Sequence, residues 1–364
     1  MITRTRARRA DATNDRFEGA GDGAAAVATR HHRRMKNPCT SVLAGVLAVL
    51  PFIGAAAFAA APAAVPEVFE PGVISGPGHD SAPAFSPDGR EVYFTRSSSA
   101  LSTILVSHRL AQGWSEPEVA PFSGQWLEME PAFAPDGSYL VYASNRPDEE
   151  GGAAIDGFFN GAARPGKGAR LWRVDRMPSG WGHPRLLPPE VNDGRAVYAP
   201  SVARDGSLYF MKPGSDGRFQ IFRAQADGPG FKPAQRMPFN EAGVASVDPA
   251  VAPDESFVVF SSSRKPAQGM DLFIAFRQGD AWSCAIHLGE TVNSPGSDAE
   301  ARLSPDAKTL YFASERTVDV PFPSTQQQTA DALKRLQAWD NGNYNIWHVG
   351  LGPWVQRGSS ACNA

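Results

Sequence analysis

Short runs of alternating apolar and polar residues fill the chain from about residue 66 to residue 357, and turn-forming residues separate them. One unit contains a small-residue run, an aromatic-rich run, a second alternating run, and a last short run that follows an aromatic residue. Period-two alternation bounded by Gly, Pro, Asp and Ser is typical of half-buried β-strands. The pattern therefore predicts units of four short strands.

The unit occurs five times, and one aspartate marks each copy. The five marker residues are Asp88, Asp136, Asp205, Asp254 and Asp306, at spacings of 48, 69, 49 and 52 residues. A four-stranded repeat near 50 residues is typical of a β-propeller blade. We predict an all-β fold, a five-bladed β-propeller of four-stranded blades. A six-bladed propeller is the alternative if an insertion hides a degenerate blade.

A proline precedes the marker aspartate in four of the five copies, and a glycine follows it in three. Proline presets φ for the second position of a tight turn, and Asp and Gly suit the third and fourth positions. We therefore interpret the aspartates as turn residues between the first and second strands, not as catalytic groups. Glu255 and Ala307 replace the glycine in the last two copies, so less regular turns are expected there.

The two ends of the repeat region complement each other. The fifth copy stops just after Trp354, where a fourth strand should begin, and only ten residues follow. Residues 68–80 precede the first copy and resemble the fourth-strand segments of other copies. The N-terminal strand is therefore predicted to complete the last blade, which leaves no open sheet edge.

The repeated phrase "PAFSPDGREVYF", which begins at Pro83, resembles the WD-like propeller repeats of the TolB type, and the resemblance covers residues 66–357. It implies a propeller fold and says little about chemistry, because such repeats serve scaffolds, peptidase lids and some carbohydrate enzymes. TolB-like propellers usually have six blades and a second domain, and this sequence departs from them in both respects.

The first 64 residues differ from the propeller region. Residues 1–34 are rich in Arg, Ala and Gly and have almost no large apolar side chains, so we interpret them as a disordered leader or as sequence upstream of a start at Met35. Residues 35–59 combine a charged start, an apolar run and an A-x-A site, which is typical of a signal peptide. We predict cleavage near Ala60, a periplasmic or secreted protein, and no membrane span after cleavage.

Removing residues 1–59 takes away nine Lys or Arg and four Asp or Glu, which leaves 26 and 34 of them and a net charge of −8. A protein of this charge is not expected to bind nucleic acid or an anionic membrane. We expect a monomer.

Cys284 and Cys362 remain after cleavage, and both a disulfide and two free thiols are open at this stage. Residues 358–364 form a C-terminal tail.

Two long insertions, residues 147–169 and 317–342, fall between second and third strands. In a propeller they lie on the face where the first strands begin, which we call the loop face; the aspartate turns lie on the opposite turn face. Binding residues commonly lie on long loops of a rigid scaffold. Phe158 and Phe159 in the first insertion are candidates for stacking on a sugar, or they anchor the loop. The second insertion predicts a helix from about Thr325 to Trp339 that Ser324 caps, with an apolar stripe of Ala330, Leu333 and Leu336. We expect this stripe to pack onto the propeller; a partner site is the alternative.

Charged residues also gather on the loop face. Six carboxylates come just before or within the first strands: Asp80, Glu128, Glu130, Asp248, Asp298 and Glu300. Such a cluster can act as general acid and base or hold a calcium ion, or its members can bond neighbouring blades through backbone N–H groups. Three arginines, Arg146, Arg264 and Arg316, end the second strands and are expected to pair with the carboxylates or to bind a ligand. The candidate binding set is Asp80, Glu130, Asp248, Glu300, Arg146, Arg264, Arg316, Phe158 and Phe159.

The sequence contains no G-x-S-x-G, H-E-x-x-H or C-x-x-C motif and no phosphate-binding glycine loop. We therefore expect an exported propeller that recognises a partner protein or a glycan at its loop face, without catalysis. The alternative is a carbohydrate-active enzyme, a glycosidase or lyase, that uses the ring of carboxylates. No cofactor is expected apart from a possible calcium ion at the channel mouth.

Overall fold

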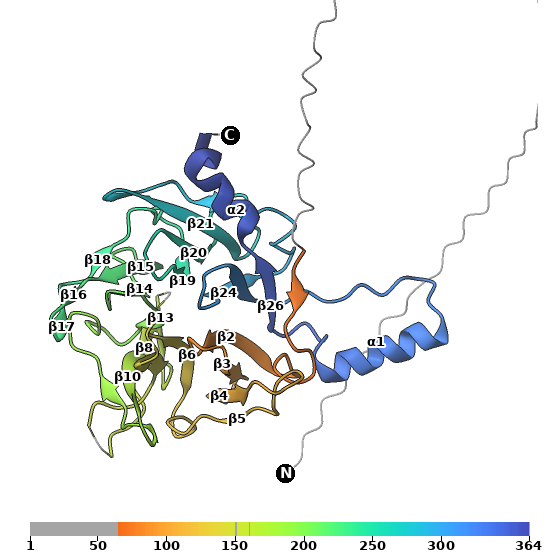
Figure 1. Ribbon diagram of the computed structural model, residues 1–364, viewed down its shortest axis with the longest axis horizontal. Helices are drawn as coiled ribbons and strands as arrows, with labels where there is room; N and C mark the ends of the chain where they lie inside the picture. The colour runs from red at the N-terminus through yellow and green to blue at the C-terminus, as the bar shows by residue number, and fades with distance from the viewer. Residues whose placement is uncertain (1–64, 150, 160, 364) are drawn as a thin grey trace, which may run out of the picture. The chain divides into compact units, whose positions relative to one another are not determined.

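The computed structural model describes residues 65–149, 151–159 and 161–363. Five small antiparallel sheets of this part of the chain stand in a ring (Figure 1), and only 8% of the described residues are helical. The predicted five-bladed propeller is therefore confirmed, with five blades and not six. Among the described residues, no helix is long and apolar enough to cross a membrane.

Each blade runs from an inner strand at the centre of the ring to a short outer strand. Blades 1 and 2 consist of β2 (His79–Phe85), β3 (Glu91–Ser97), β4 (Ser102–His108) and β5 (Glu118–Val119), and of β6 (Glu128–Phe133), β7 (Tyr139–Ser144), β10 (Arg170–Met177) and β12 (Arg185–Leu186). Blades 3 and 4 consist of β13 (Tyr198–Val202), β14 (Leu208–Pro213), β15 (Phe219–Ala224) and β18 (Gln235–Arg236), and of β19 (Ser246–Val251), β20 (Phe257–Ser262), β21 (Asp271–Gln278) and β23 (Ile286–His287). Blade 5 consists of β24 (Asp298–Leu303), β25 (Thr309–Ser314), β26 (Asn345–Gly350) and β1 (Glu67–Val68). The remaining strands are the two-residue segments β11 (Gly180–Trp181), β16 (Ala226–Asp227), β17 (Gly230–Phe231) and β22 (Ala281–Trp282), and the insertion hairpin β8 (Gly157–Phe159) and β9 (Ala162–Arg164).

The N-terminal strand closes the ring, as the sequence predicts. In β1, Glu67 lies opposite His348 of β26, and Val68 lies opposite Trp347. The next residue, Phe69, is 8% exposed, and its backbone N–H donates to the carbonyl of Ile346 at 2.7 Å. The last blade is thus made from both ends of the described chain.

The apolar core lies between neighbouring blades. Between blades 1 and 2, Tyr93 and Ile104 pack in one cluster with Leu140 and Tyr142. Equivalent clusters join blades 2 and 3, 3 and 4, 4 and 5, and 5 and 1. Burying one large apolar side chain contributes about 1.5–3 kcal/mol. The contacts between blades are therefore the main apolar contribution to stability, and they are complete only when the ring is closed.

The marker aspartates lie in turns of one kind, as predicted. In the first copy, the N–H of Gly89 donates to the carbonyl of Ser86 at 2.8 Å, and the Asp88 carboxylate accepts from the N–H of Arg90 at 3.1 Å. The expectation of less regular turns in the last two copies is wrong. Glu255 and Ala307 adopt φ of 58° and 55° and close the same hydrogen bond at 2.8 Å.

Every inner strand carries a bulge at the same position of the repeat. The register of the inner strand against its neighbour shifts there in all five blades, and the bulged residue has a positive φ between 48° and 57°. The five residues are Ala82, Glu130, Ala199, Asp248 and Glu300. A bulge re-aims side chains and increases local twist. Because two of the five are alanines, the strained backbone belongs to the blade architecture and not to a particular side chain.

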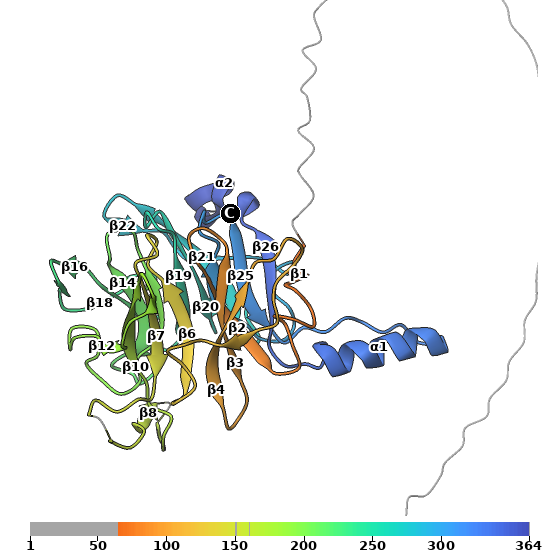
Figure 2. The same cartoon turned by 60° about the horizontal axis from the view of Figure 1, so that its bottom comes forward.

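Helix α1 (Gln326–Ala338) confirms the predicted helix but not its surroundings. Its N-cap is Thr325, whose side chain forms a capping box with Gln328; the expected cap, Ser324, lies one residue too early. No residue of α1 is buried, and Leu333 and Leu336 are 52% and 50% exposed. The helix extends away from the blades in both views (Figures 1 and 2). The prediction that its apolar stripe packs onto the propeller is therefore wrong.

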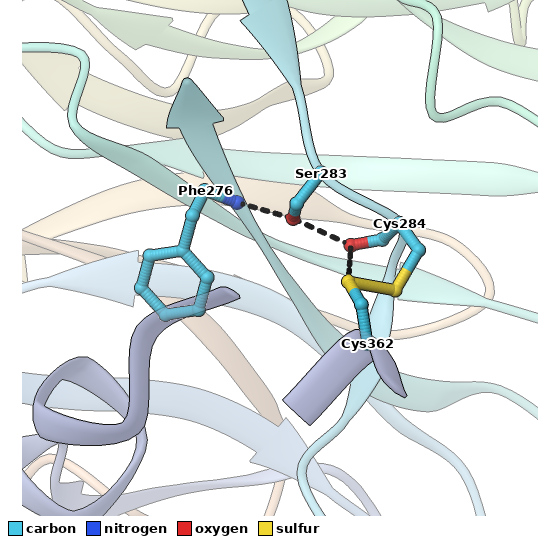
Figure 3. Close-up of a disulfide and its surroundings, with 4 residues drawn as sticks. All are labelled: Phe276, Ser283, Cys284 and Cys362. Atoms are coloured by element: carbon cyan, nitrogen blue, oxygen red, sulfur yellow. Dashed lines mark hydrogen bonds between the residues drawn. A yellow bond between two sulfur atoms is a disulfide. The ribbon is translucent and has the colours of Figure 1, made fainter. Parts of the chain in front are cut away.

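A disulfide ties the C-terminal segment to blade 4. Cys284, just before β23, is bonded to Cys362 in the 3₁₀ helix η1 (Gly358–Asn363), which follows the short helix α2 (Gly352–Arg357). The two Cα atoms are 6.0 Å apart (Figure 3). Beside it, the hydroxyl of Ser283 accepts from the N–H of Phe276 and donates to the carbonyl of Cys284. The sequence left the pairing open, and the structure resolves it as a disulfide.

Candidate functional site

Carboxylates at the start of the inner strands are held by arginines from the ends of the second strands. In blade 1, Asp80 is fully buried, pairs with Arg96 at 2.6 Å and accepts from the N–H of Gly76 at 2.6 Å. Burial raises the pKa of Asp80, and the ion pair with Arg96 opposes that rise. The carboxylate is therefore fully engaged within its own blade.

The same arrangement recurs in blades 2 and 5. Arg146 lies 3.5 Å from Glu128, and Arg316 lies 2.8 Å from Asp298. Both carboxylates also accept a backbone N–H from four residues earlier in the chain, at 2.8 Å and 2.6 Å. The predicted pairing of Arg146 and Arg316 with carboxylates is confirmed. These contacts fix the inter-blade loops, which is the structural role that the sequence left open.

Arg264 differs from the other arginines because its blade has a serine, Ser246, where the others have a carboxylate. Its guanidinium donates to the carbonyl of Phe239 at 2.9 Å and to the hydroxyls of Ser246 and Ser262 at 3.0 Å. The side chain is 9% exposed, and burial lowers its pKa. Its hydrogen bonds therefore lie within the propeller wall.

Three bulge residues bring carboxylates together at the centre of the ring. The Oε2 of Glu130 accepts from the N–H of Ala199 at 2.6 Å, and an Oδ2 of Asp248 accepts from the N–H of Glu300 at 3.0 Å. Glu130 and Asp248 are only 6% and 4% exposed. The charges of Asp248 and Glu300 both act on Glu130, so the three predicted residues lie near one another although they come from blades 2, 4 and 5.

Burial and mutual repulsion keep protons on this cluster. Burial, together with the charges of Glu300 and Asp248, raises the pKa of Glu130 to about 8. Burial and the charge of Asp248 raise the pKa of Glu300 to about 7, and burial also raises the pKa of Asp248. A carboxyl group that keeps its proton near neutral pH can donate a hydrogen bond or act as a general acid.

Arg302 is the charged partner that the sequence reading missed. It is 4% exposed, its positive charge lowers the pKa of all three carboxyl groups, and it lines a hollow of about 90 Å³ on the turn-face side. One guanidinium nitrogen donates to the carbonyl of Ala301 at 2.7 Å, whereas Nη2 has no hydrogen-bond partner among the described residues. A signal was present, because the other four copies have Ala or Ser at this position of the repeat.

A larger hollow opens on the loop face between blades 2 and 3. Its volume is about 440 Å³, and its lining includes Asp156, Phe158, Asp193, Arg195 and Lys212. Phe158 is 66% exposed on β8, while the side chain of the other predicted aromatic, Phe159, lies outside the described residues. Phe158 is thus the one described member of the predicted binding set that lines this hollow.

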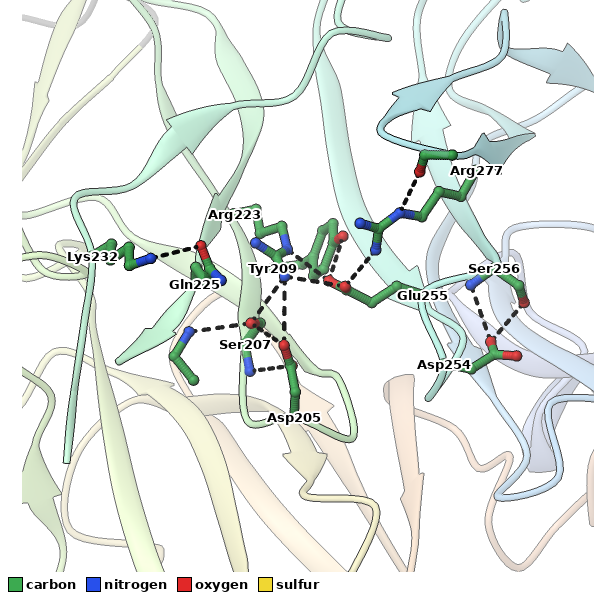
Figure 4. A network of polar contacts seen from close by, with 12 residues as sticks. Asp205, Ser207, Tyr209, Arg223, Gln225, Lys232, Asp254, Glu255, Ser256 and Arg277 are labelled. Atoms are coloured by element: carbon green, nitrogen blue, oxygen red, sulfur yellow. Dashed lines mark hydrogen bonds and ion pairs between the residues drawn. The ribbon is translucent and has the colours of Figure 1, made fainter. Parts of the chain in front are cut away.

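A second missed feature is the polar network around Glu255, between blades 3 and 4 (Figure 4). Its carboxylate accepts from Arg223 at 2.6 Å, from Arg277 at 2.7 Å and from the hydroxyl of Tyr209 at 2.8 Å. Burial and the neighbouring carboxylate raise the pKa of Tyr209 above its ordinary range. The glutamate at a glycine position of the repeat therefore joins two blades on the turn face.

Comparisons with known proteins find solved structures of low similarity. No protein-family model matches the chain, and no curated protein matches it. The solved structures that match include TolB from Acinetobacter baumannii, with 14% identity, a TM-score of 0.44, and coverage of 75% of this chain and 54% of that one. A putative TolB from Agrobacterium tumefaciens matches with 16% identity and a TM-score of 0.44 over 75% of this chain and 91% of that one. XC5397 from Xanthomonas campestris, described as a gluconolactonase, matches with 16% identity and a TM-score of 0.45 over 77% of this chain and 88% of that one. TolB structures are thus among the matches, as the resemblance of the repeats predicts, and the sheets themselves establish the five-bladed propeller.

Proposed function

We propose that the protein is an exported β-propeller that binds a partner protein or a glycan at its loop face and does not turn it over. The observation that carries the proposal is the hollow between blades 2 and 3, where the exposed Phe158 stands among charged side chains. By contrast, Asp80, Arg146, Arg264 and Arg316 make contacts with their own blades or with the loops between blades. The disulfide between Cys284 and Cys362 supports export, because disulfides persist in oxidising compartments.

A blocking substitution tests this proposal. Gly194 lines the hollow and a Cβ added there would meet nothing within 4 Å, so we expect Gly194→Trp to extend into the hollow. We expect this variant to keep its Tm and to lose binding to immobilised candidate partners, namely oligosaccharides and purified exported proteins of the source cell. The matched control is Gly350→Trp, at the turn-face end of β26, where an added Cβ also meets nothing within 4 Å. Equal binding by both variants would contradict the proposal.

Catalysis is the second candidate, and the central carboxyl groups favour it. The pKa values of about 8 for Glu130 and about 7 for Glu300 suit proton transfer at neutral pH. A screen of the purified protein against polysaccharides and aryl glycosides tests it. Turnover that falls by about 100-fold or more in Glu130→Gln, at an unchanged Tm, would establish an enzyme and overturn the binding proposal.

Calcium at the channel mouth stays a prediction. Among the described residues, no group of three or more His, Cys, Asp or Glu side chains has an arrangement suited to a metal ion. A fall in Tm after dialysis against a chelator, reversed by added calcium, would support the ion.

A further inference from the structure

The hollow between blades 2 and 3 has fixed walls. The N–H of Ile155 donates to the carbonyl of Asn145 at 2.9 Å, which ties the start of the β8–β9 hairpin to the end of β7. Gly168 lies close to the start of the hairpin and to the segment before β13. A Cβ added at Gly168 would be 2.6 Å from the carbonyl oxygen of Asp156 and 2.8 Å from that of Arg195. The hairpin is therefore packed against the segment that leads into β13, and the site is built before a ligand arrives.

The charges around the hollow are balanced. Two acidic residues, Asp156 and Asp193, face two basic ones, Arg195 and Lys212. Lys212 and Asp193 form an ion pair, and Asp156 accepts the N–H of Gly166 at 2.6 Å. Because the lining carries no net charge and its lysine is already paired, the site does not favour an anionic or a cationic ligand over a neutral one.

The remaining feature is an aromatic ring presented to solvent beside these polar groups. Phe158 is 66% exposed, although phenylalanine is among the residue types most often buried. A ligand that covers the Phe158 ring needs an apolar face. The same ligand needs hydroxyl groups along its edge to form hydrogen bonds with the charged side chains. A volume of about 440 Å³ is within the range of sites for small ligands, about 300–1,000 Å³.

We propose that this hollow binds a neutral saccharide, with one sugar ring stacked on Phe158 and its hydroxyl groups bonded to Asp193, Arg195 and Lys212. The inference rests on the proposed function and names the ligand class of the same site. An apolar peptide fits less well, since it would remove four charged side chains from water and offer them no new hydrogen bonds.

Calorimetric titration with defined trisaccharides tests the inference. The neutral ligands are cellotriose, maltotriose, xylotriose and triacetylchitotriose, and the acidic one is trigalacturonic acid. We expect at least one neutral trisaccharide to bind the wild-type protein more tightly than the acidic one does. Phe158→Ala should weaken that binding by about tenfold or more at an unchanged Tm. The matched control is Phe322→Ala, because Phe322 is 86% exposed on the other insertion and should leave affinity unchanged.

A charge substitution adds a second, independent readout. Asp193→Asn removes the partner of Lys212 and gives the lining a net positive charge, so the affinity for trigalacturonic acid should rise. The inference is overturned if no neutral trisaccharide binds, if Phe158→Ala binds as well as the wild type, or if the wild type prefers the acidic ligand. If instead a purified exported protein binds and Gly194→Trp abolishes that binding, the saccharide inference fails and the proposed function stands.

Discussion

At the scale of single residues, the central carboxyl groups are the feature that the fold does not require. The bulge they occupy is also formed by Ala82 and Ala199, so the backbone conformation needs no carboxylate. Burying three acidic groups near one arginine costs free energy whenever more than one of them is ionised. The cluster therefore either serves binding or catalysis at the centre of the ring, or makes the stability of the protein depend on pH.

The pH dependence has a definite sign. Folded Glu130 keeps its proton up to about pH 8, whereas an unperturbed glutamate releases it near pH 4.5. Between these values the folded state binds more protons than the unfolded state, so the free energy of unfolding falls as the pH rises. The stabilisation is complete below pH 4.5 and is lost as the pH passes 8. We expect a loss of up to about 5 kcal/mol across this window, measured by urea unfolding.

Glu130→Gln cannot ionise and should flatten that profile, whereas Glu290→Gln, at an exposed site, should leave it unchanged. A wild-type stability that is constant or rises between pH 5 and pH 8, by an amount that Glu130→Gln does not alter, would contradict the assignment.

The sequence predicts the role of a residue when that role belongs to a recurring position of the repeat. The turn aspartates and the pairing of Arg146 and Arg316 follow from positions that recur in each copy. Arg302 was missed because its surroundings are set by blades that lie far apart in the chain. The pair of Lys212 with Asp193, which lie 19 residues apart in one repeat, was also missed. Periodicity shows where a strand lies but not which side chains from different blades meet.

At the scale of elements, the two-residue strand β1 closes the junction between blades 5 and 1. Phe69, directly after it, packs edge-on against Phe85 and Trp114 of blade 1 and against Tyr311 of blade 5. The sequence predicted this closure because both ends of the repeat region were incomplete. The exposure of α1 was not predictable in the same way, since an amphipathic pattern does not say whether a partner surface lies within reach.

Truncating Phe69 should open the junction between blades 5 and 1. Replacing a buried Phe by Ala costs about 3–5 kcal/mol, and Phe69→Ala should lower the free energy of unfolding by that amount. Val65→Ala is the control, because Val65 is 69% exposed and should change stability by less than about 0.5 kcal/mol.

Deletion of residues 68–76 should additionally expose a sheet edge and cause aggregation. A deletion variant that stays monomeric and melts like the parent would refute the closure as a stabilising feature.

The disulfide is the other element-scale constraint, and it joins positions 78 residues apart. Breaking such a cross-link typically costs about 2–4 kcal/mol. We expect this loss in Cys284→Ser and in Cys362→Ser, measured by thermal unfolding under non-reducing conditions. The double variant should be no less stable than either single variant, because all three lack the same bond. Additive losses would mean that the cysteines stabilise the fold separately.

At the scale of the whole molecule, five similar units form one closed ring whose turn face differs from its loop face. Each apolar cluster is shared by two blades, and the last blade combines both ends of the described chain. The turn face is made of short, repeated turns, whereas the loop face carries the two insertions that differ from copy to copy. A binding function is therefore expected on the loop face, where the sequence can vary without disturbing the contacts between blades.

Export is the prediction that concerns the whole chain, and it depends on residues outside the described ones. The A-x-A site at residues 57–59 predicts a mature N-terminus at or near Ala60. N-terminal sequencing of the periplasmic or secreted form checks it. Because signal peptidase sites require small residues, Ala57→Arg combined with Ala59→Arg should block cleavage and leave a longer, membrane-retained chain. An intact Met1 or Met35 end in a cytoplasmic fraction would contradict export, and it would also leave the disulfide of Cys284 and Cys362 in a reducing compartment where such bonds are rare.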